Sequence, residues 1–306
     1  MTPGRALERV LDTISAEAPE AVQRGRFALV EALGWTKTTT WPVVRQFSGL
    51  AEGAPFELIW RPGRPGLYWT AEPAASELAR DRRIERSVEL VETIGGRLDA
   101  PTRQLALATA NASSANWPVW VAGRHTKRSD AAKLYVLVNA VPPAFEAVTP
   151  LLRGADQPTM IGLTPQGERE FYWTRPTRDA GDLRQLRADR ATAPLAEMLN
   201  AALIDWTGSG FEDKAGGRLR LSLRYGVSGQ PETLAAFVRV DAAGGGPRVR
   251  IRLLARGGND NPALARCWAD GQLRPMLLSL AASTDGLNLA LGLRDNGSLT
   301  PPDVRV

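Results

Sequence analysis

A glutamate and an arginine lie near residue 60, in a stretch rich in aromatic side chains that spans residues 55–73. Its Pro-Gly-Arg-Pro-Gly segment, residues 62–66, predicts a tight turn between two short strands. Side chains alternate across a strand, which puts Glu57, Ile59 and Arg61 on one face. A carboxylate and a guanidinium beside aromatic rings indicate a polar pocket lined with rings. The alternative is an ordinary half-buried hairpin with a solvated charged face, in which Glu57 pairs with Arg61.

Three later stretches also place an aliphatic face opposite a face of cations and polar groups. The polar faces carry Lys133, Tyr135, Leu137 and Asn139, then Arg218, Arg220, Ser222 and Arg224, and finally Arg248, Arg250 and Arg252. Arginine clamps phosphate and carboxylate groups through paired hydrogen bonds, so these faces suit anionic ligands. A closed barrel would turn them into a strongly positive interior, whereas an open sheet would form a basic surface. Periodicity alone leaves both arrangements open.

Helices and hairpins must position these side chains, and the two alternate along the chain. Helices are expected at 4–17, 19–34, 76–94 with Ser76 as N-cap, 101–112 and 143–153, as a long helical region over about 179–206, and at 262–281. Strands are expected in the 55–73 hairpin, at 117–121 and 133–141 around a basic loop at 124–128, and at 159–164, 168–174, 218–225, 235–241, 247–254 and 286–294. Short turns make neighbouring strands antiparallel, and the returning helices must cover one face. No linker divides residues 1–306, so a single domain is expected.

Composition narrows the class of protein. The 306 residues are 43% hydrophobic and 23% charged, with a net charge of +5, as in a soluble globular protein. No apolar run could span a membrane and the N-terminus lacks the core of a signal peptide, so a cytoplasmic location is expected. The single cysteine, Cys267, rules out an internal disulfide framework. The single histidine, His125, is expected at the surface, and no zinc site of ordinary type is predicted.

Several catalytic motifs are absent from the sequence. It contains no P-loop and no glycine fingerprint of a dinucleotide site. It also contains no Asp-Asp-x-x-Asp motif, which argues against the magnesium-dependent chemistry of helical prenyl synthases.

Four stretches follow one another in a characteristic order. They are the hairpin that runs from Pro55 to Trp60 and resumes at Thr70 to Pro73, the Lys133-Leu134-Tyr135 strand, the segment from Gly167 to Trp173, and the segment from Arg248 to Arg252 followed by Gly258-Asn259-Asp260. In this order they resemble the dimethylallyltryptophan synthase family of aromatic prenyltransferases. The resemblance spans roughly residues 55–294 and implies the ABBA fold. In this α+β fold, helices surround a ten-stranded antiparallel barrel with a polar interior.

The resemblance also implies an activity, which is metal-independent transfer of a prenyl group from dimethylallyl or a longer prenyl diphosphate to an indole or tryptophan-type acceptor. It implies no cofactor and no membrane or nucleic-acid partner. Glu57 stands at the position of the carboxylate that polarises the indole N–H and helps remove the proton. The residues implied for diphosphate are Lys133, Tyr135, Tyr172, Arg220, Arg224, Arg248 and Arg250. Those implied for the acceptor pocket are Ile59, Arg61 and Tyr68.

Some positions depart from the family pattern. Tyr68 stands where the family usually has an arginine for diphosphate, and Glu168 and Glu170 stand where basic residues are expected. Residues that could compensate are Arg61, Arg64, Arg175 and Arg224. The alternative functions are a non-catalytic barrel or basic sheet that binds an anionic ligand or nucleic acid, and a prenyltransferase for a peptide or phenolic acceptor.

Overall fold

The computed structural model describes residues 3–16, 18–34, 55–61, 64–73, 78–115, 117–138, 159–176, 186–208, 210, 218–239 and 273–295. The helices in these ranges are α1 (Pro3–Ser15), α2 (Pro19–Leu33), α4 (Arg80–Gly95), α5 (Ala100–Ala112) and α7 (Ala193–Thr207). The strands are β1 (Phe56–Trp60), β2 (Leu67–Ala71), β3 (Val119–His125), β4 (Asp130–Leu137), β5 (Met160–Leu163), β6 (Arg169–Pro176), β7 (Arg218–Tyr225), β8 (Pro231–Arg239), β9 (Leu273–Ser283) and β10 (Gly286–Asp295).

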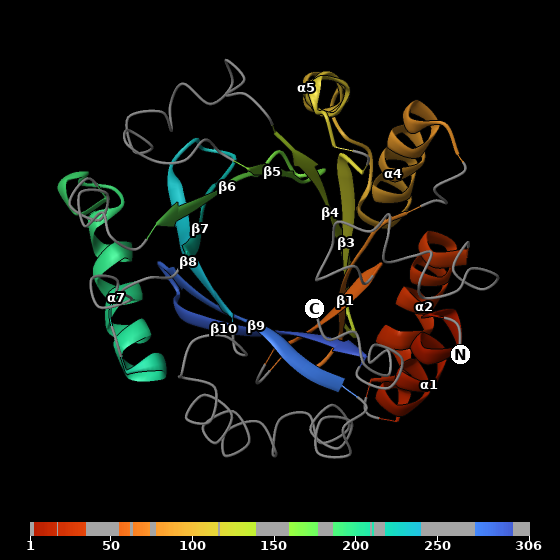
Figure 1. The fold of residues 1–306 in the computed structure, drawn as a ribbon, viewed down its shortest axis with the longest axis horizontal. Coiled ribbons are helices and arrows are strands. Elements are labelled where there is room, and N and C mark those ends of the chain that lie inside the picture. The colour runs from red at the N-terminus through yellow and green to blue at the C-terminus, as the bar shows by residue number, and fades with distance from the viewer. Residues whose placement is uncertain are drawn as a thin grey trace, which may run out of the picture.

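The ten strands close into an antiparallel barrel. Each strand pairs with its neighbour in the chain, and β10 pairs with β1 to complete the ring seen in Figure 1. The ring consists of five hairpins, β1–β2 through β9–β10, whose turns are short. Closure satisfies the backbone hydrogen bonds of every strand and leaves no open sheet edge. The predicted ten-stranded antiparallel barrel is therefore confirmed.

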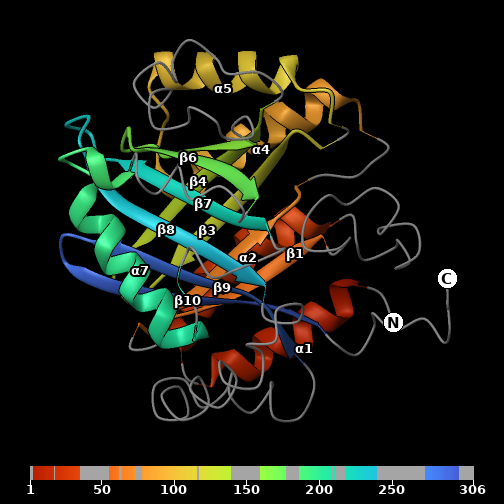
Figure 2. The ribbon, with the colours of Figure 1, turned by 60° about the vertical axis from the view of Figure 1, so that its left-hand side comes forward.

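The helices cover the outside of the barrel. In Figure 1, α7 lies on one side of the ring of strands and α1, α2, α4 and α5 lie on the top and the opposite side. Figure 2 shows α7 lying along β8 and β9, with which it is in contact. The side chains that point outward from the strands are apolar and form the core beneath the helices. They include Leu58, Trp69, Val121, Leu134, Leu163, Leu221, Leu234, Leu280 and Leu291, each at most 2% exposed. Burial of this apolar layer is the main force that holds helices to barrel.

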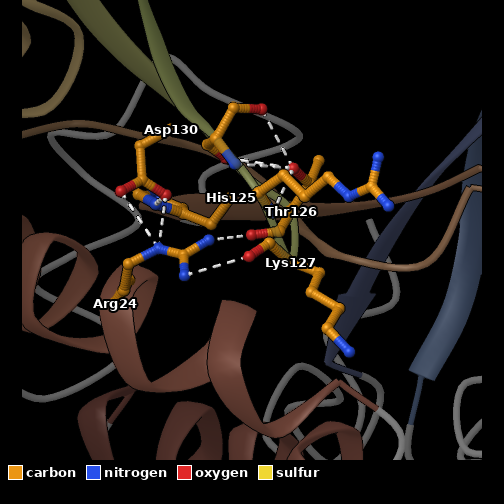
Figure 3. A network of polar contacts seen from close by, with 7 residues as sticks. Arg24, His125, Thr126, Lys127 and Asp130 are labelled. Carbon is orange, nitrogen blue, oxygen red and sulfur yellow. Dashed lines mark hydrogen bonds and ion pairs between the residues drawn. The ribbon is translucent and has the colours of Figure 1, made fainter.

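Hydrogen bonds and an ion pair connect α2 to the β3–β4 hairpin (Figure 3). Arg24 on α2 donates to both carboxylate oxygens of Asp130 at 3.1 Å, and also to the backbone carbonyls of Thr126 and Lys127. The Nδ1 atom of His125 lies 3.0 Å from Asp130 Oδ1. One carboxylate thus links the helix to the end of the hairpin.

The surface position predicted for His125 is wrong. The residue is 2% exposed and lies beneath α2, where its ring stacks on Trp69. Burial lowers the pKa of His125 below its ordinary value, although Asp130 acts in the opposite direction. The error arose because His125 was assigned to a basic loop, whereas it is the last residue of β3 and points outward into the core.

A second error concerns the helix expected at 262–281. Residues 273–283 form β9, which pairs with both β8 and β10. Leucine and alanine favour helices intrinsically, but Met276, Leu278 and Leu280 alternate with half-buried neighbours and fill the outward core. Tertiary burial therefore overrides the local preference.

Other boundaries shift by a few residues. The basic loop at 124–128 is shorter than expected because β3 continues through His125 and β4 begins at Asp130. The helix expected from 76 begins at Arg80 with Ala79 as N-cap, so the proposed cap at Ser76 is wrong. The helix expected at 143–153 and the strand at 247–254, with Arg248, Arg250 and Arg252, lie outside the described residues. Among the helices that are described, none is long and apolar enough to cross a membrane.

Gly25 offers a test of how closely α2 approaches the barrel. A Cβ atom built at Gly25 would lie 2.7 Å from His125 Cγ and 2.8 Å from Leu67 Cδ2. His125 is held by Asp130 and Trp69 and cannot easily move aside. Gly25→Ala is expected to lower the free energy of unfolding by about 1–3 kcal/mol, as overpacking does.

Gly34 provides the matched control, because a Cβ there meets no atom of the described residues within 4 Å and its φ of −51° is helical. Gly34→Ala is expected to leave stability unchanged or to raise it slightly, by up to about 1 kcal/mol. Urea unfolding of both variants measures the difference. Equal stability of the two variants would contradict the close contact at Gly25.

Candidate functional site

Glu57 on β1 and Arg220 on β7 face each other inside the barrel. The two strands are not neighbours in the ring, yet the two side chains interact electrostatically, which requires both to point inward. Burial raises the pKa of Glu57 to about 7, and Arg220 opposes that rise only in part. Burial likewise lowers the pKa of Arg220, with Glu57 acting the other way, although Arg220 keeps much of its surface accessible. Glu57 is thus a carboxylate that titrates near neutral pH.

The pairing of Glu57 with Arg61, considered from the sequence, does not occur between these two described residues. Arg61 instead lies over the ring of Tyr68, with its guanidinium carbon 5.0 Å from the ring centroid. Ile59, which lies between Glu57 and Arg61 in the sequence, is half-buried on β1 and pairs with Gly292 of β10. The inward face of β1 carries Glu57 and Ile59, and Arg61 follows directly after the strand on the same side, as the alternation predicted.

Gly292 makes room for the Glu57 carboxylate, a role that the sequence analysis missed. A Cβ atom at Gly292 would lie 2.8 Å from Glu57 Cδ and would overlap one of its carboxylate oxygens. A side chain at this position would therefore displace the carboxylate. The only sequence signal was a glycine at an inward position of a strand, which marks close approach by another group.

A row of aromatic rings lines the wall between the charged groups. Tyr135 on β4 contacts Tyr172 on β6 edge-on, with ring centroids 5.6 Å apart, and Tyr172 contacts Phe237 on β8 at 5.8 Å. Burial, together with the nearby Glu170 carboxylate, raises the pKa of Tyr172 well above its ordinary value, so the phenol stays neutral. Neutral rings present an electron-rich face that stabilises cations.

Lys133 is already paired inside the barrel. Its ammonium forms an ion pair with Glu170 on β6, and Ser222 on β7 donates a hydrogen bond to the other carboxylate oxygen. Burial alone would lower the pKa of Lys133 and raise that of Glu170, but the ion pair outweighs burial and shifts both pKa values the opposite way. Both groups therefore stay charged. Glu170, which departs from the family pattern, is thus ion-paired with Lys133, the cation that was expected to hold diphosphate.

Arg224 has acidic partners as well. Its guanidinium lies 3.3 Å from a carboxylate oxygen of Glu168 and 3.5 Å from one of Glu232, and it donates to Thr233 at 3.1 Å. The two glutamates that depart from the family pattern thus each bind one of the predicted diphosphate cations. The described part of the interior is consequently less positive than the sequence predicted.

Arg61 and Arg124 form a different group around Tyr68. Arg124 pairs with Tyr68 in the β2–β3 register, and its guanidinium carbon lies 5.8 Å from the Tyr68 ring centroid. Burial lowers the pKa of Arg61, and the nearby charges of Arg124 and Arg64 lower it further. The sequence predicts Arg124 in the basic loop at 124–128, whereas Arg124 lies on β3.

The remaining predicted residues lie as follows. Arg248 and Arg250 are outside the described residues, and the side chain of Arg175 is also outside them. Trp120 donates its indole N–H to Glu72 at 3.1 Å. Electrostatic interactions and ring contacts link Glu57, Arg220, Tyr172 and Tyr135 across the barrel. Tyr135 is also within electrostatic reach of Arg61, and the Lys133 ammonium lies 5.7 Å from its ring centroid.

This arrangement has a definite chemical capacity. A carboxylate that is half ionised near pH 7 can accept a hydrogen bond or a proton, which is the property of a general base. The tyrosine row can stabilise a positive centre, and the arginines can hold an anion. An anion, a transient cation and a proton can thus be handled within one barrel.

No protein-family model matches the chain, and no curated protein sequence matches it. Solved structures do. 5-Dimethylallyltryptophan synthase from Streptomyces coelicolor superposes with a TM-score of 0.70 at 16% identity over 96% of both chains. The prenyltransferase PriB, in a ternary complex with L-tryptophan and dimethylallyl thiolodiphosphate, gives 0.71 at 17% identity over 100% of both chains. NotF, in complex with brevianamide F and the same thiolodiphosphate, gives 0.64 at 12% identity, covering 98% of this chain and 94% of its own.

These likenesses cover nearly the whole chain at low sequence identity. They agree with the closed ten-stranded barrel and its surrounding helices described above. The chain therefore has the ABBA-type barrel fold of the aromatic prenyltransferases.

Proposed function

We propose that this protein is an aromatic prenyltransferase. It transfers a dimethylallyl or longer prenyl group from the prenyl diphosphate to an indole or tryptophan-type acceptor, without an essential metal. The observation that carries the proposal is the inward placement of Glu57, with a pKa of about 7, across from Arg220, which in turn interacts with Tyr172 of the aromatic row. The ligands named for PriB and NotF, which are a prenyl diphosphate analogue with tryptophan or brevianamide F, support the substrate class.

The reaction divides into three steps that the site can serve. First, the allylic carbon–oxygen bond of the donor breaks and its electron pair leaves with the diphosphate, whose charge the arginines neutralise. Next, the allylic cation, stabilised by the faces of Tyr135 and Tyr172, is attacked by a carbon of the indole ring. Finally, that ring carbon loses its proton to a base, and the aromatic ring is restored.

Glu57 acts in the second and third steps. Its carboxylate accepts a hydrogen bond from the indole N–H, which raises the electron density of the ring, and it then assists in removing the proton. The buried position of Glu57 strengthens both interactions because less water competes there. Gly292 leaves the space that the carboxylate occupies.

The first prediction from the proposed function concerns Glu57→Gln, which keeps the shape of the side chain and deletes its charge. The rate of prenyl transfer is expected to fall by about 100-fold to 10,000-fold, as for loss of a general base, with little change in donor affinity. Product formation from dimethylallyl diphosphate and an indole panel, read by mass spectrometry, measures it. The control is Glu89→Gln, an exposed carboxylate on α4 paired only with Arg86 among the described residues. A folded Glu57→Gln enzyme within about threefold of the parent rate would remove Glu57 from the mechanism.

A second prediction is the pH dependence. Only ionised Glu57 accepts the N–H, so kcat/KM is expected to rise with pH through about 7, and this limb should be absent in Glu57→Gln. Stability should respond in the opposite sense. The pKa of Glu57 in the folded state lies above its ordinary value of 4.5, so the free energy of unfolding should fall as pH rises from 4.5 to about 7, more in the parent than in the variant. Parallel pH profiles for both proteins would count against the assignment.

A third prediction concerns metals. The sequence lacks an aspartate-rich magnesium motif, and arginines can neutralise the leaving diphosphate directly. Turnover is therefore expected to stay within about twofold in excess chelator, and added magnesium should not restore anything. Loss of turnover in chelator, with recovery on adding magnesium, would show that the diphosphate is neutralised by a metal instead.

A further inference from the structure

Two arginines converge on one tyrosine at the β1–β2–β3 side of the barrel. Tyr68 on β2 lies beneath the guanidinium of Arg61, which directly follows β1, and that of Arg124 on β3, at 5.0 and 5.8 Å from the ring centroid. Tyr68 and Arg124 are direct partners in the register of β2 and β3. Cation–π contacts with the Tyr68 ring thus orient the two planar guanidinium groups.

These two arginines have no carboxylate partner within the part of the chain that the structure describes. The Nε atom of Arg61 is buried and makes no hydrogen bond there. By contrast, Lys133 is paired with Glu170, and Arg224 with Glu168 and Glu232. Each of those cations is matched by a carboxylate, whereas Arg61 and Arg124 bring two like charges together without one. Arg124 is exposed and Arg61 is half-buried, so both guanidinium groups are open to an anion that enters from solvent.

The position of Arg61, directly after β1, fits a site for the prenyl donor. Arg61 follows Glu57 by four residues on the same face, which is about 13 Å along the strand at about 3.3 Å per residue. A small prenyl group and one indole ring fit end to end within that length. Arg61 also lies within electrostatic reach of Tyr135, the first ring of the aromatic row. A diphosphate at Arg61 would therefore direct its prenyl carbon toward the rings and toward Glu57.

We propose that Arg61 and Arg124, which stack on Tyr68, are the principal ligands of the donor diphosphate. They take the place of the Lys133 ammonium, which is already ion-paired with Glu170. This inference rests on the proposed function, because it names the donor site of the same reaction. It assigns the leaving group to two bidentate guanidiniums, that of Arg61 directly after β1 and that of Arg124 on β3. Lys133 and Glu170 then form a charge-neutral part of the wall.

The experiment is titration calorimetry of the full-length chain with inorganic pyrophosphate at constant ionic strength. Arg61→Gln and Arg124→Gln are each expected to weaken binding about tenfold to a hundredfold, the effect of losing one charge-assisted contact. Arg61→Lys keeps the charge but loses the fork and the stacking, and should weaken binding by an intermediate factor. Thermal unfolding of each variant verifies that it is folded.

Two further variants make the comparison specific. Arg128→Gln removes an exposed cation from the β3–β4 turn, so it controls for a general loss of positive charge at that end of the barrel. Lys133→Gln combined with Glu170→Gln removes both charges of the buried pair at once. Each is expected to bind pyrophosphate within about threefold of the parent.

The possible results separate the donor site from the activity. Strong loss in the Lys133/Glu170 double variant, with normal binding in folded Arg61→Gln and Arg124→Gln, overturns the assignment even if the parent transfers prenyl groups. Failure of the parent to bind pyrophosphate at all overturns it too. Arginine-dependent pyrophosphate binding in a parent that prenylates no indole supports the anion site and contradicts the proposed function.

Discussion

Closure of the ten-stranded ring is the constraint on which the other features of this molecule depend. Once β10 pairs with β1, the alternation of side chains along every strand has only two destinations, the helices outside or the interior. Outward residues such as Trp69 and Leu134 become the core, and inward residues such as Glu57 and Arg220 are brought together from distant parts of the chain. An open sheet with the same residues would have left those charges apart and in water.

Closure also makes charge inside the barrel costly, and the structure compensates some of the charged groups but not others. Lys133 and Glu170 neutralise each other, with Ser222 completing the hydrogen bonding. Glu57 and the Arg61–Arg124 pair are less well compensated, as the pKa shifts of Glu57 and Arg61 show. Perturbed groups of this kind concentrate where a protein binds or transforms a ligand. The contrast between the two kinds of charge, rather than the total positive charge, marks the candidate site.

The fold and the site support different parts of the functional argument. Likeness to solved prenyltransferases at 12–17% identity covers the architecture, and one architecture can host many chemistries. The case for prenyl transfer comes instead from the groups inside this barrel: a carboxylate that titrates near neutrality, neutral tyrosine rings and arginines available to an anion. Glu168 and Glu170 show why residues cannot be transferred from the family one by one, because they change which cations are available.

The sequence by itself determined the strand alternation, most hairpins and the inward position of Glu57, because these follow from local periodicity and turn chemistry. It did not determine β9, where burial between β8 and β10 outweighs the helical preference of leucine and alanine. Nor did it reveal that His125 is buried or that Arg124 lies on β3, since both depend on where one strand ends. The partners of Lys133 and Glu57 were decided only by the tertiary structure. Glu170 is 37 residues from Lys133, and Arg220 reaches Glu57 across the barrel, so only the closed register brings each pair together.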